Sequence, residues 1–430
     1  MKPRPETYTD NIARLFPEMV SGSRKIRTVT LQVTEACNLS CTYCYQIAKT
    51  PNRMSYDTAI QFLTLLLEDK VPHFTQKETA GIVLEFIGGE PFLEIELIQK
   101  VSDWFVRELL RRGHPWRHFF RFSFSSNGTL YFDPKVQEYL RRYRRWVSLS
   151  ISVDGDRQLH DSCRLFPDGS GSYELASAAA QDWMKYEGDM PSTKATLSPE
   201  NIRYTAQAVK SLIELGYRAI FINCVYEEGW TVEHAKILYR QMTDLGHWLI
   251  QSGWHDKVYV RLFEEDLFRP LPASETQNYC GGTGEMLAVD WRGVLYPCIR
   301  YMPSSLGDDA EPLETGRVVN GKVVVTAQQN RCMECLRAVT RASQSTKECL
   351  ECSIAAGCAW CSAYNYQSGD VNVRQTHICW MHRARALANY EFWKEYYAFT
   401  GSDKQATCHL DPRWAAVLRE PGQGGIADEH

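Results

Sequence analysis

Short runs rich in β-branched and aromatic residues alternate with longer amphipathic stretches through the first half of the chain. The amphipathic stretches have helical periodicity and lie near 55–70, 93–112, 134–145, 172–186 and 199–215. Ser198 is the expected N-cap of the last helix. Repeated strand–helix units predict a parallel sheet with helices on its outer face and ligands at the carboxyl ends of the strands. The six predicted strands are 28–34, 82–88, 119–125, 147–152, 192–197 and 219–225.

The regular alternation ends near residue 265, where cysteine and glycine become frequent. The chain contains 15 cysteines, and most of them follow this point. Clustered cysteines in such a region predict a second domain held together by metal. The chain therefore divides into an extension (1–26), an α/β core (27–265), a cysteine-rich domain (266–385) and a C-terminal helix with a frayed tail (386–430).

Charge and hydropathy exclude several classes of protein. The 48 Lys and Arg residues nearly balance the 52 Asp and Glu residues, so no bulk attraction to nucleic acid or to an anionic membrane is expected. No apolar stretch approaches the roughly 18 residues that span a bilayer, and the first residues lack the apolar core of a signal peptide. We expect a cytoplasmic protein, in which clustered cysteines perform metal or redox chemistry.

Three cysteines follow the first predicted strand with the spacing C-x3-C-x2-C: Cys37, Cys41 and Cys44, with Tyr43 before the third. A cubane iron–sulfur cluster is held by thiolates that converge on it. Three ligands for four irons leave one iron free to chelate a substrate or cofactor. The alternatives are a zinc site, which would need a fourth ligand, and a chance group of buried cysteines.

Polar residues also follow the next three predicted strands. Gly88, Gly89 and Glu90 end the second strand, where glycines allow close backbone approach and a carboxylate can bind an ammonium group. On their own, these residues are also typical of a simple turn. Asn127 ends the third strand, and Ser152 and Asp154 end the fourth. Arg164 follows in a polar segment, as a partner for a carboxylate or as an exposed loop residue.

The cysteines of the second domain have a regular order. Cys280 and Cys298 come first, and Cys332-x2-Cys335 follows. The remaining set has the pattern C-x2-C-x5-C-x2-C-x17-C and comprises Cys349, Cys352, Cys358, Cys361 and Cys379. CxxC spacing alone is also compatible with a zinc ribbon.

Together these motifs resemble the radical S-adenosylmethionine (SAM) superfamily, and the cysteine-rich part resembles its SPASM domain. The resemblance implies a partial (β/α)6 TIM-like barrel followed by an iron–sulfur SPASM domain. It further implies that Cys37, Cys41 and Cys44 hold a [4Fe–4S] cluster whose open iron binds SAM and cleaves it to a 5′-deoxyadenosyl radical. The residues that would contact SAM are Tyr43, Gly88, Gly89, Glu90, Asn127, Ser152 and Arg164.

The SPASM resemblance implies two auxiliary [4Fe–4S] clusters, three clusters in all. In some members a cysteine stands where this chain has Met286, and the gap before Cys361 is one residue shorter than usual. The cluster nearer the barrel therefore either keeps an open iron or recruits Cys332 or Cys335. The expected ligands are Cys280, Cys298 and Cys361 for the near cluster, and Cys349, Cys352, Cys358 and Cys379 for the distal cluster.

Family members modify peptides or proteins, and one position distinguishes among them. Sulfatase maturases place an aspartate directly after a Y-P-C motif as a general base, whereas this chain has Ile299, which cannot accept a proton. The strings CTYCYQ and GCAWC resemble peptide maturases that form thioether links from cysteine sulfur to carbon, and thioether formation is our first prediction. Alternatives are carbon–carbon cross-linking, epimerisation and sulfatase-maturase-like oxidation of Cys or Ser. A different class is an inactive electron-transfer or adaptor protein.

The expected partners are a cysteine-containing precursor peptide and an electron donor such as flavodoxin or ferredoxin, with no nucleic acid and no membrane. Fewer than about 30 residues precede the first strand, which is too short for a winged-helix leader-binding domain. Leader recognition would then use the barrel, the SPASM face or a separate protein.

Overall fold

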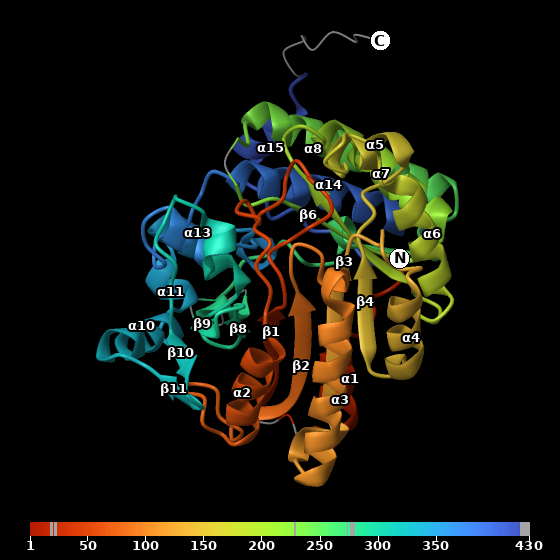
Figure 1. Cartoon of the computed structure of the whole chain (residues 1–430). Helices are drawn as coiled ribbons and strands as arrows, with labels where there is room; N and C mark the ends of the chain where they lie inside the picture. The colour runs from red at the N-terminus through yellow and green to blue at the C-terminus, as the bar shows by residue number, and fades with distance from the viewer. Residues whose placement is uncertain (18–19, 21–23, 228, 273, 276–279, 422–430) are drawn as a thin grey trace.

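The structure is a computed structural model that describes residues 1–17, 20, 24–227, 229–272, 274–275 and 280–421. All six predicted strands form, and hydrogen-bonded neighbours among them are parallel. A short seventh strand follows the sixth. The α/β fold class is therefore confirmed (Figure 1). The strands are β1 (Lys25–Gln32), β2 (Thr79–Ile87), β3 (Phe120–Ser126), β4 (Val147–Ile151), β5 (Ser192–Leu197), β6 (Ala219–Cys224) and β7 (Tyr259–Val260).

Helices follow the strands and cover their outer faces (Figure 1). They are α2 (Tyr56–Leu67), α3 (Ile95–Arg111), α4 (Pro134–Tyr143), α5 (Arg157–Cys163), α6 (Tyr173–Met184), α7 (Thr205–Leu215) and α8 (Val232–Gln251). The last predicted helix begins later than expected, at Thr205. Ser198 does not cap it: the Ser198 N–H donates to Asn201 Oδ1 (2.8 Å) in a turn, and a 3-10 turn over Ile202–Tyr204 leads into the helix.

The alternation of side chains along the strands gives the sheet two different faces. On β3, the rings of Phe122 and Phe124 are buried under the helices, and Phe124 stacks on Phe86 of β2 with 5.5 Å between ring centroids. Ser123 and Ser125 alternate with these rings and point to the opposite face. The helix-facing side is therefore the hydrophobic core, and the inner face of the curved sheet is polar.

The strands belong to two sheets. One sheet has the order β11-β10-β9-β8-β1-β2-β3-β4, and the other has the order β5-β6-β7. β4 lies next to β5, but no ladder joins them among the described residues. β8 pairs in parallel with β1, so strands of the cysteine-rich region extend the core sheet. These added strands are β8 (Leu287–Val289), β9 (Val294–Tyr296), β10 (Gly316–Val319) and β11 (Lys322–Val324).

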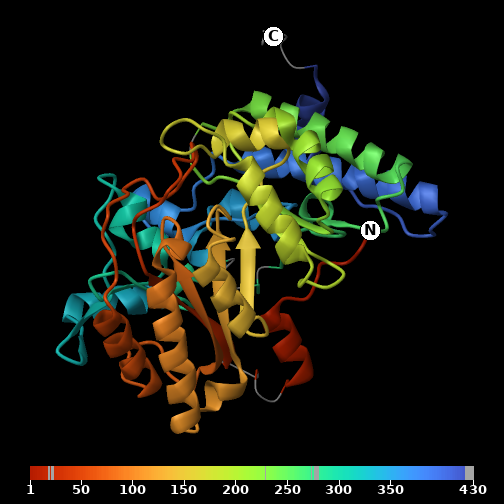
Figure 2. The ribbon, with the colours of Figure 1, turned by 45° about the vertical axis from the view of Figure 1, so that its right-hand side comes forward.

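The C-terminal region packs back on the core through a long helix. α14 (Cys379–Thr400) lies along α8, and Figure 2 shows both helices at the end of the molecule toward which β4 points. Phe392 of α14 packs against Phe263 with the rings tilted and their centroids 4.4 Å apart. The predicted tail after residue 421 lies outside the described residues. The remaining helices are α1 (Tyr8–Leu15), α9 (Pro303–Leu306), α10 (Ala327–Arg337), α11 (Arg341–Gln344), α12 (Lys347–Leu350), α13 (Ser362–Gln367) and α15 (Pro412–Arg419).

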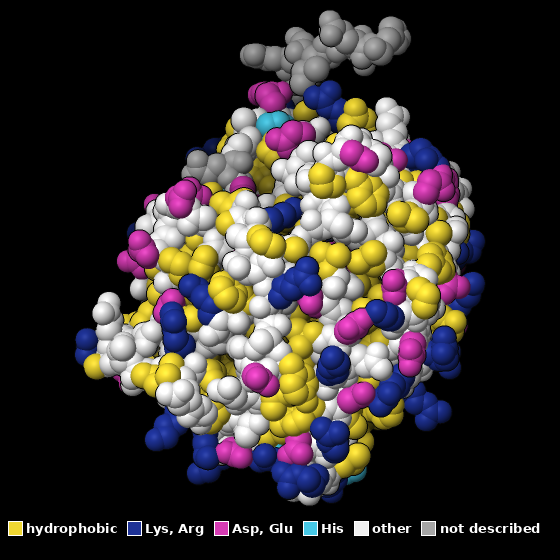
Figure 3. All heavy atoms as spheres, in the orientation of Figure 1, with side chains coloured by type: hydrophobic (Ala, Val, Ile, Leu, Met, Phe, Trp, Pro, Cys, Tyr) yellow, Lys and Arg dark blue, Asp and Glu magenta, His cyan; other side chains and the backbone are white. Residues whose placement is uncertain are grey.

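Acidic and basic side chains are interspersed on the face shown in Figure 3. Among the helices that the structure describes, none combines the length and the apolar character needed to cross a bilayer.

Candidate functional site

The three-cysteine loop lies at the carboxyl end of β1, where the parallel topology predicts a site. Its backbone is fixed to the last residue of α5 and the segment that follows: the Thr42 N–H donates to Cys163 O (3.0 Å), and the Ser40 N–H donates to Leu165 O (2.7 Å). Burial raises the pKa of the Cys37 thiol to about 11 and also raises that of Cys41. These buried thiols would ionise readily only beside a bound cation.

Gly88 and Gly89 allow the end of β2 to approach this loop closely. A Cβ atom at Gly89 would lie 2.4 Å from Ala36 O and 2.6 Å from Cys37 Cβ, which no side chain could occupy. A Cβ at Gly88 would lie 2.7 Å from the Thr34 side chain. The Glu90 N–H donates to Ala36 O (3.0 Å) and holds this contact. The glycines therefore position the cysteine loop itself.

The Glu90 carboxylate is buried at the same edge of the sheet. Its Oε1 accepts hydrogen bonds from the Phe92 N–H (3.1 Å) and Ser126 Oγ (2.9 Å), and its Oε2 accepts one from the Asn127 N–H (2.8 Å). Burial nevertheless raises its pKa to about 7, because these hydrogen bonds only partly replace the lost hydration. Glu90 thus links the end of β2 to the end of β3.

Asn127 ties the end of β3 to the cysteine loop. Its Nδ2 donates to Asn38 Oδ1 (2.8 Å), and Asn38 Nδ2 donates to Thr129 Oγ1 (2.7 Å). Ser152 lies on the neighbouring strand end, where its N–H donates to Ser126 O (2.9 Å). The predicted polar residues of β2, β3 and β4 are therefore gathered at one edge of the sheet.

Arg164 and Tyr43 meet on the buried carboxylate of Asp154. Arg164 Nε donates to Asp154 Oδ2 (2.7 Å), and the Tyr43 hydroxyl donates to the same oxygen. The guanidinium also lies over the Tyr43 ring, 5.4 Å from its centroid. Burial alone would raise the pKa of Asp154, but Arg164 and these hydrogen bonds hold it below its usual value. The carboxylate partner of Arg164 in this structure is thus Asp154.

In the cysteine-rich region, Cys280, Cys298 and Cys361 are neighbours. Burial raises the pKa of Cys298, and the thiols of Cys361 and Cys280 raise it further. A Cβ atom at Gly282 would lie 2.8 Å from Ser362 Oγ, 3.5 Å from Cys298 Sγ and 3.6 Å from Cys280 Sγ. The glycine therefore allows the Ser362 hydroxyl to approach these cysteines closely.

Cys332 and Cys335, the two cysteines that the near cluster could recruit, lie on α10. Cys332 is half-buried and Cys335 is exposed. Burial raises the pKa of Cys332, and the thiol of Cys335 raises it further. Met286, at the position that holds a cysteine in some SPASM proteins, folds back on Gly281: a Cβ there would lie 2.7 Å from Met286 Cγ.

The four cysteines predicted for the distal cluster also form one group. Burial raises the pKa of Cys358 to about 12, and Cys379, Cys352 and Cys349 raise it further. Cys379 begins α14, and Cys349 lies in α12. Within the described part of the chain, no three His, Cys, Asp or Glu side chains converge tightly enough to hold a single metal ion.

Arg300 lies at the junction between the barrel and the cysteine-rich region. Its guanidinium sits over the Tyr45 ring (5.1 Å to the centroid) and pairs with Glu227 at 2.7 Å. The neighbouring Ile299 begins a 3-10 turn directly after Cys298. Tyr45, Arg300 and Glu227 were not predicted as site residues, because their proximity depends on the docking of two regions distant in sequence.

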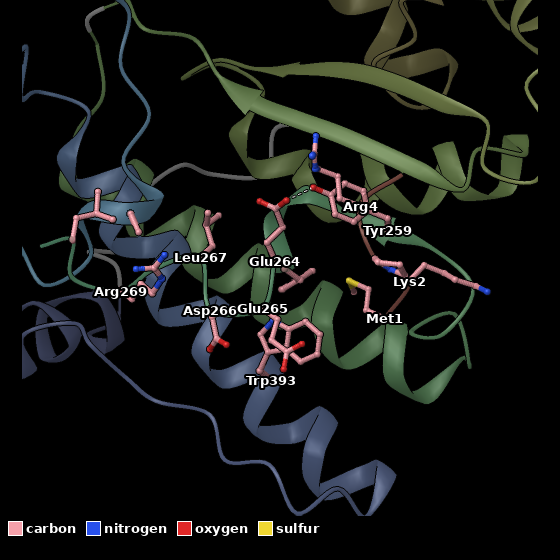
Figure 4. A pocket seen from close by; sticks show the side chains of 14 residues that line it. Met1, Lys2, Arg4, Tyr259, Glu264, Glu265, Asp266, Leu267, Arg269 and Trp393 are labelled. Atoms are coloured by element: carbon pink, nitrogen blue, oxygen red, sulfur yellow. Dashed lines mark hydrogen bonds between the residues drawn. The ribbon is translucent and has the colours of Figure 1, made fainter. Parts of the chain in front are cut away.

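A cavity of about 660 Å³ lies away from the three-cysteine loop (Figure 4). The N-terminal residues, the segment around Glu264 and Asp266, and Trp393 of α14 form its walls. Ala356, between the distal cysteines Cys352 and Cys358, also lines it. None of the residues predicted to contact SAM is among its lining residues within the described chain.

No protein-family model matches the sequence. Over 285 residues the chain is 25% identical to the cysteine-type anaerobic sulfatase-maturating enzyme of Clostridium perfringens, an alignment covering 63% of this chain and 73% of that enzyme.

Two solved structures resemble the whole architecture. The structure of anSMEcpe with bound AdoMet (SAM) matches with a TM-score of 0.58 at 17% identity, covering 91% of this chain and 98% of that chain. SuiB of Streptococcus suis bound to the precursor peptide SuiA matches with a TM-score of 0.51 at 11% identity, covering 85% of this chain and 79% of that chain. At these identities the likeness shows the fold, and it confirms the α/β core followed by a cysteine-rich region.

Proposed function

We propose that this protein is a radical SAM enzyme that modifies a peptide or protein substrate. The observation that carries the proposal is the three-cysteine loop at the carboxyl end of β1, packed against Gly89 and flanked by Glu90 and Arg164. The proposal draws further support from the sequence similarity to a sulfatase-maturating enzyme and from the fold shared with an AdoMet-bound protein.

The cofactors are SAM and three [4Fe–4S] clusters. The donor sets fit such clusters, because each is a group of neighbouring, largely buried thiols. When bound, a reduced cluster and SAM together supply a radical strong enough to abstract hydrogen from an unactivated C–H bond.

The chain's own residues bind and orient the cofactor. Glu90 and the backbone of Gly88 and Gly89 would receive the ammonium group of SAM. Ser152 and the guanidinium of Arg164 would receive its carboxylate, for which the planar guanidinium fork is suited. Asp154 holds Arg164 in place through the 2.7 Å ion pair and leaves other guanidinium N–H groups for a ligand.

The reaction that we place first is a thioether link between a substrate cysteine and a carbon atom of the same peptide. It is favoured by Ile299, which puts no proton acceptor after Cys298. A second candidate is oxidation of a substrate cysteine or serine, which the 25% identity to a cysteine-type sulfatase-maturating enzyme favours. The partners would be a cysteine-containing peptide and a flavodoxin or ferredoxin as electron donor.

Mass spectrometry of the reaction products distinguishes these reactions. The anaerobically reconstituted protein is incubated with cysteine-containing peptides encoded by neighbouring small reading frames, and the products are alkylated with iodoacetamide. A thioether lowers the mass by two hydrogens and removes one alkylatable thiol. Oxidation of cysteine to formylglycine removes the sulfur, and epimerisation leaves the mass unchanged. Oxidation of serine and a carbon–carbon link both remove two hydrogens and keep every thiol, but only the serine product carries an aldehyde. A product two hydrogens lighter that retains every free thiol would exclude the thioether reaction.

A further inference from the structure

The inner face of the barrel contains a second cavity, below the candidate SAM site. It has a volume of about 290 Å³ and is lined by β4, β5, β6 and the turn after β7. Ser150, Lys194, Asn223 and Arg261 contribute its polar lining, and Phe221 contributes an apolar wall. The ring of Phe221 contacts Tyr259, which lines the larger cavity of Figure 4. The linings of the two cavities therefore meet at the contact between Phe221 and Tyr259.

Two basic side chains, Lys194 and Arg261, line the smaller cavity. Lys194 is exposed although it lies inside a strand, and it makes no hydrogen bond or ion pair with any residue that the structure describes. Arg261 has a partner in Glu264, 3.7 Å away. Within the described chain, no carboxylate lines this cavity. A strand lysine whose ammonium group makes no hydrogen bond or close ion pair with the described residues is suited to an anionic ligand.

The acidic group that faces Lys194 is Glu85 of β2. The Glu85 carboxylate accepts a hydrogen bond from Thr30 Oγ1 (2.7 Å), and among the described residues it is not close enough to Lys194 for an ion pair. Burial raises its pKa, and Lys194 partly offsets this effect. Glu85 therefore contributes to the field in the barrel without occupying the ammonium group of Lys194.

The position of the cavity relates it to the reaction. Ser150 lies on β4 and Ser152 directly follows the strand, so in extended backbone their side chains point to the same face about 7 Å apart. Ser152 is one of the residues expected at SAM, and the substrate must present its reacting carbon to SAM from inside the barrel. A group in the cavity would thus lie deeper in the barrel than the reacting part of the substrate, by about two residues along β4.

We propose that the barrel binds a carboxylate of the substrate peptide, an Asp or Glu side chain near the reacting residue, with Lys194 as its ion-pair partner. This inference rests on the proposed function and adds a substrate preference to it. Asn223 and Ser150 supply hydrogen bonds to the same group. The other source of a carboxylate is SAM itself, and the experiment separates the two.

The test uses the full-length protein, reconstituted anaerobically with iron, sulfide and SAM. A phage-displayed library of random peptides with one fixed cysteine is selected on the parent protein, on Lys194→Glu and on the control Lys100→Glu. Lys100 is an exposed residue on α3, so its substitution makes the same change in net charge outside the barrel. Iron content and circular dichroism verify that each variant is folded. SAM affinity is measured for all three proteins.

The parent and Lys100→Glu should enrich peptides with Asp or Glu at fixed distances from the cysteine, whereas Lys194→Glu should enrich Lys or Arg there. Replacing that Asp by Asn in one selected peptide should weaken binding to the parent about tenfold, as expected for a lost charge-assisted contact. Acidic enrichment that persists in Lys194→Glu would overturn the inference alone. Weaker SAM affinity with unchanged peptide preference would assign Lys194 to the cofactor. Failure of the parent to enrich any peptide would overturn the proposed peptide substrate as well.

Discussion

At the scale of single residues, the candidate site depends on buried charges whose partners come from different elements. Arg164 and Tyr43 were predicted as site residues from their motifs, and both lie beside the cysteine loop. Their shared contact with Asp154 could not be predicted, because it depends on how the loops after β1 and β4 pack together. Glu85 is a charged residue within an otherwise apolar strand, and this interruption could have indicated from the sequence that its position faces a polar interior.

Removing Asp154 should destabilise the protein strongly. Asp154→Ala leaves the Arg164 guanidinium buried without a counter-charge, and the expected loss is about 3–5 kcal/mol in the free energy of unfolding. Urea denaturation measures this loss. Glu351→Ala, which breaks an exposed pair with Lys347, is the control and should have little effect. Equal effects of the two substitutions would show that the Asp154 pair is not a buried structural contact.

Glu90 should make the stability of the cofactor-free protein depend on pH. Its pKa rises from 4.5 to about 7 on folding, so the folded chain retains a proton that the unfolded chain has lost within this interval. Stability should therefore fall by about 3 kcal/mol between pH 4.5 and 7 and then level off. In Glu90→Gln this part of the slope should be absent, whatever the absolute stability of the variant. Identical slopes in urea titrations of parent and variant would contradict the raised pKa.

At the scale of elements, the runs of β-branched and aromatic residues were a reliable guide to the strands. This pattern predicted all six long strands, because the side chains that face the helices form the buried core. It missed β7, since two residues carry no periodic signal, and it placed the start of α7 too early. Ser198 and Pro199 resemble a helix N-terminus, but Asn201 binds the Ser198 backbone and forms a separate turn first. The break between β4 and β5 has no signature in either strand.

The close contact between β2 and the cysteine loop predicts a specific defect in Gly89→Ala. A methyl group there would overlap Ala36 O and Cys37 Cβ, so the loop must shift. We expect a destabilisation of about 1–3 kcal/mol and a loss of roughly one cluster's iron after reconstitution. Gly113→Ala is the control for iron content: its positive φ of 58° strains an added side chain, but no atom lies within 4 Å of the added carbon, so the strain stays local. Full iron content in Gly89→Ala would show that the glycine is not required by the cluster loop.

At the scale of the whole molecule, the core and the cysteine-rich region share one sheet. β8 pairs with β1, and α14 packs along α8, so both regions are fixed to each other at two places. The change in composition near residue 265 indicated a second region. The pairing of the two regions could not be predicted, because short strands such as β8 acquire their partners only through tertiary contacts.

Arg27 should be a structural link at this junction. Its side chain is 3% exposed and donates to Gly284 O (2.8 Å) and Glu285 O (3.0 Å) from β1. Arg27→Ala removes these charge-assisted hydrogen bonds and should lower stability by about 3 kcal/mol. Chemical denaturation compares it with Arg317→Ala on β10, which alters an exposed arginine of the same sheet. If the two variants are equally stable, Arg27 does not hold the regions together.

The cysteine loop provides the most direct test of the proposed radical SAM activity. The reconstituted parent should bind about twelve irons per chain, and a variant with Cys37, Cys41 and Cys44 all changed to Ala should bind about eight. With dithionite and SAM, the parent should release 5′-deoxyadenosine, and the variant should release none while remaining folded. Release of 5′-deoxyadenosine by the triple variant at the parent's rate would contradict the assignment of these cysteines as the site of SAM cleavage.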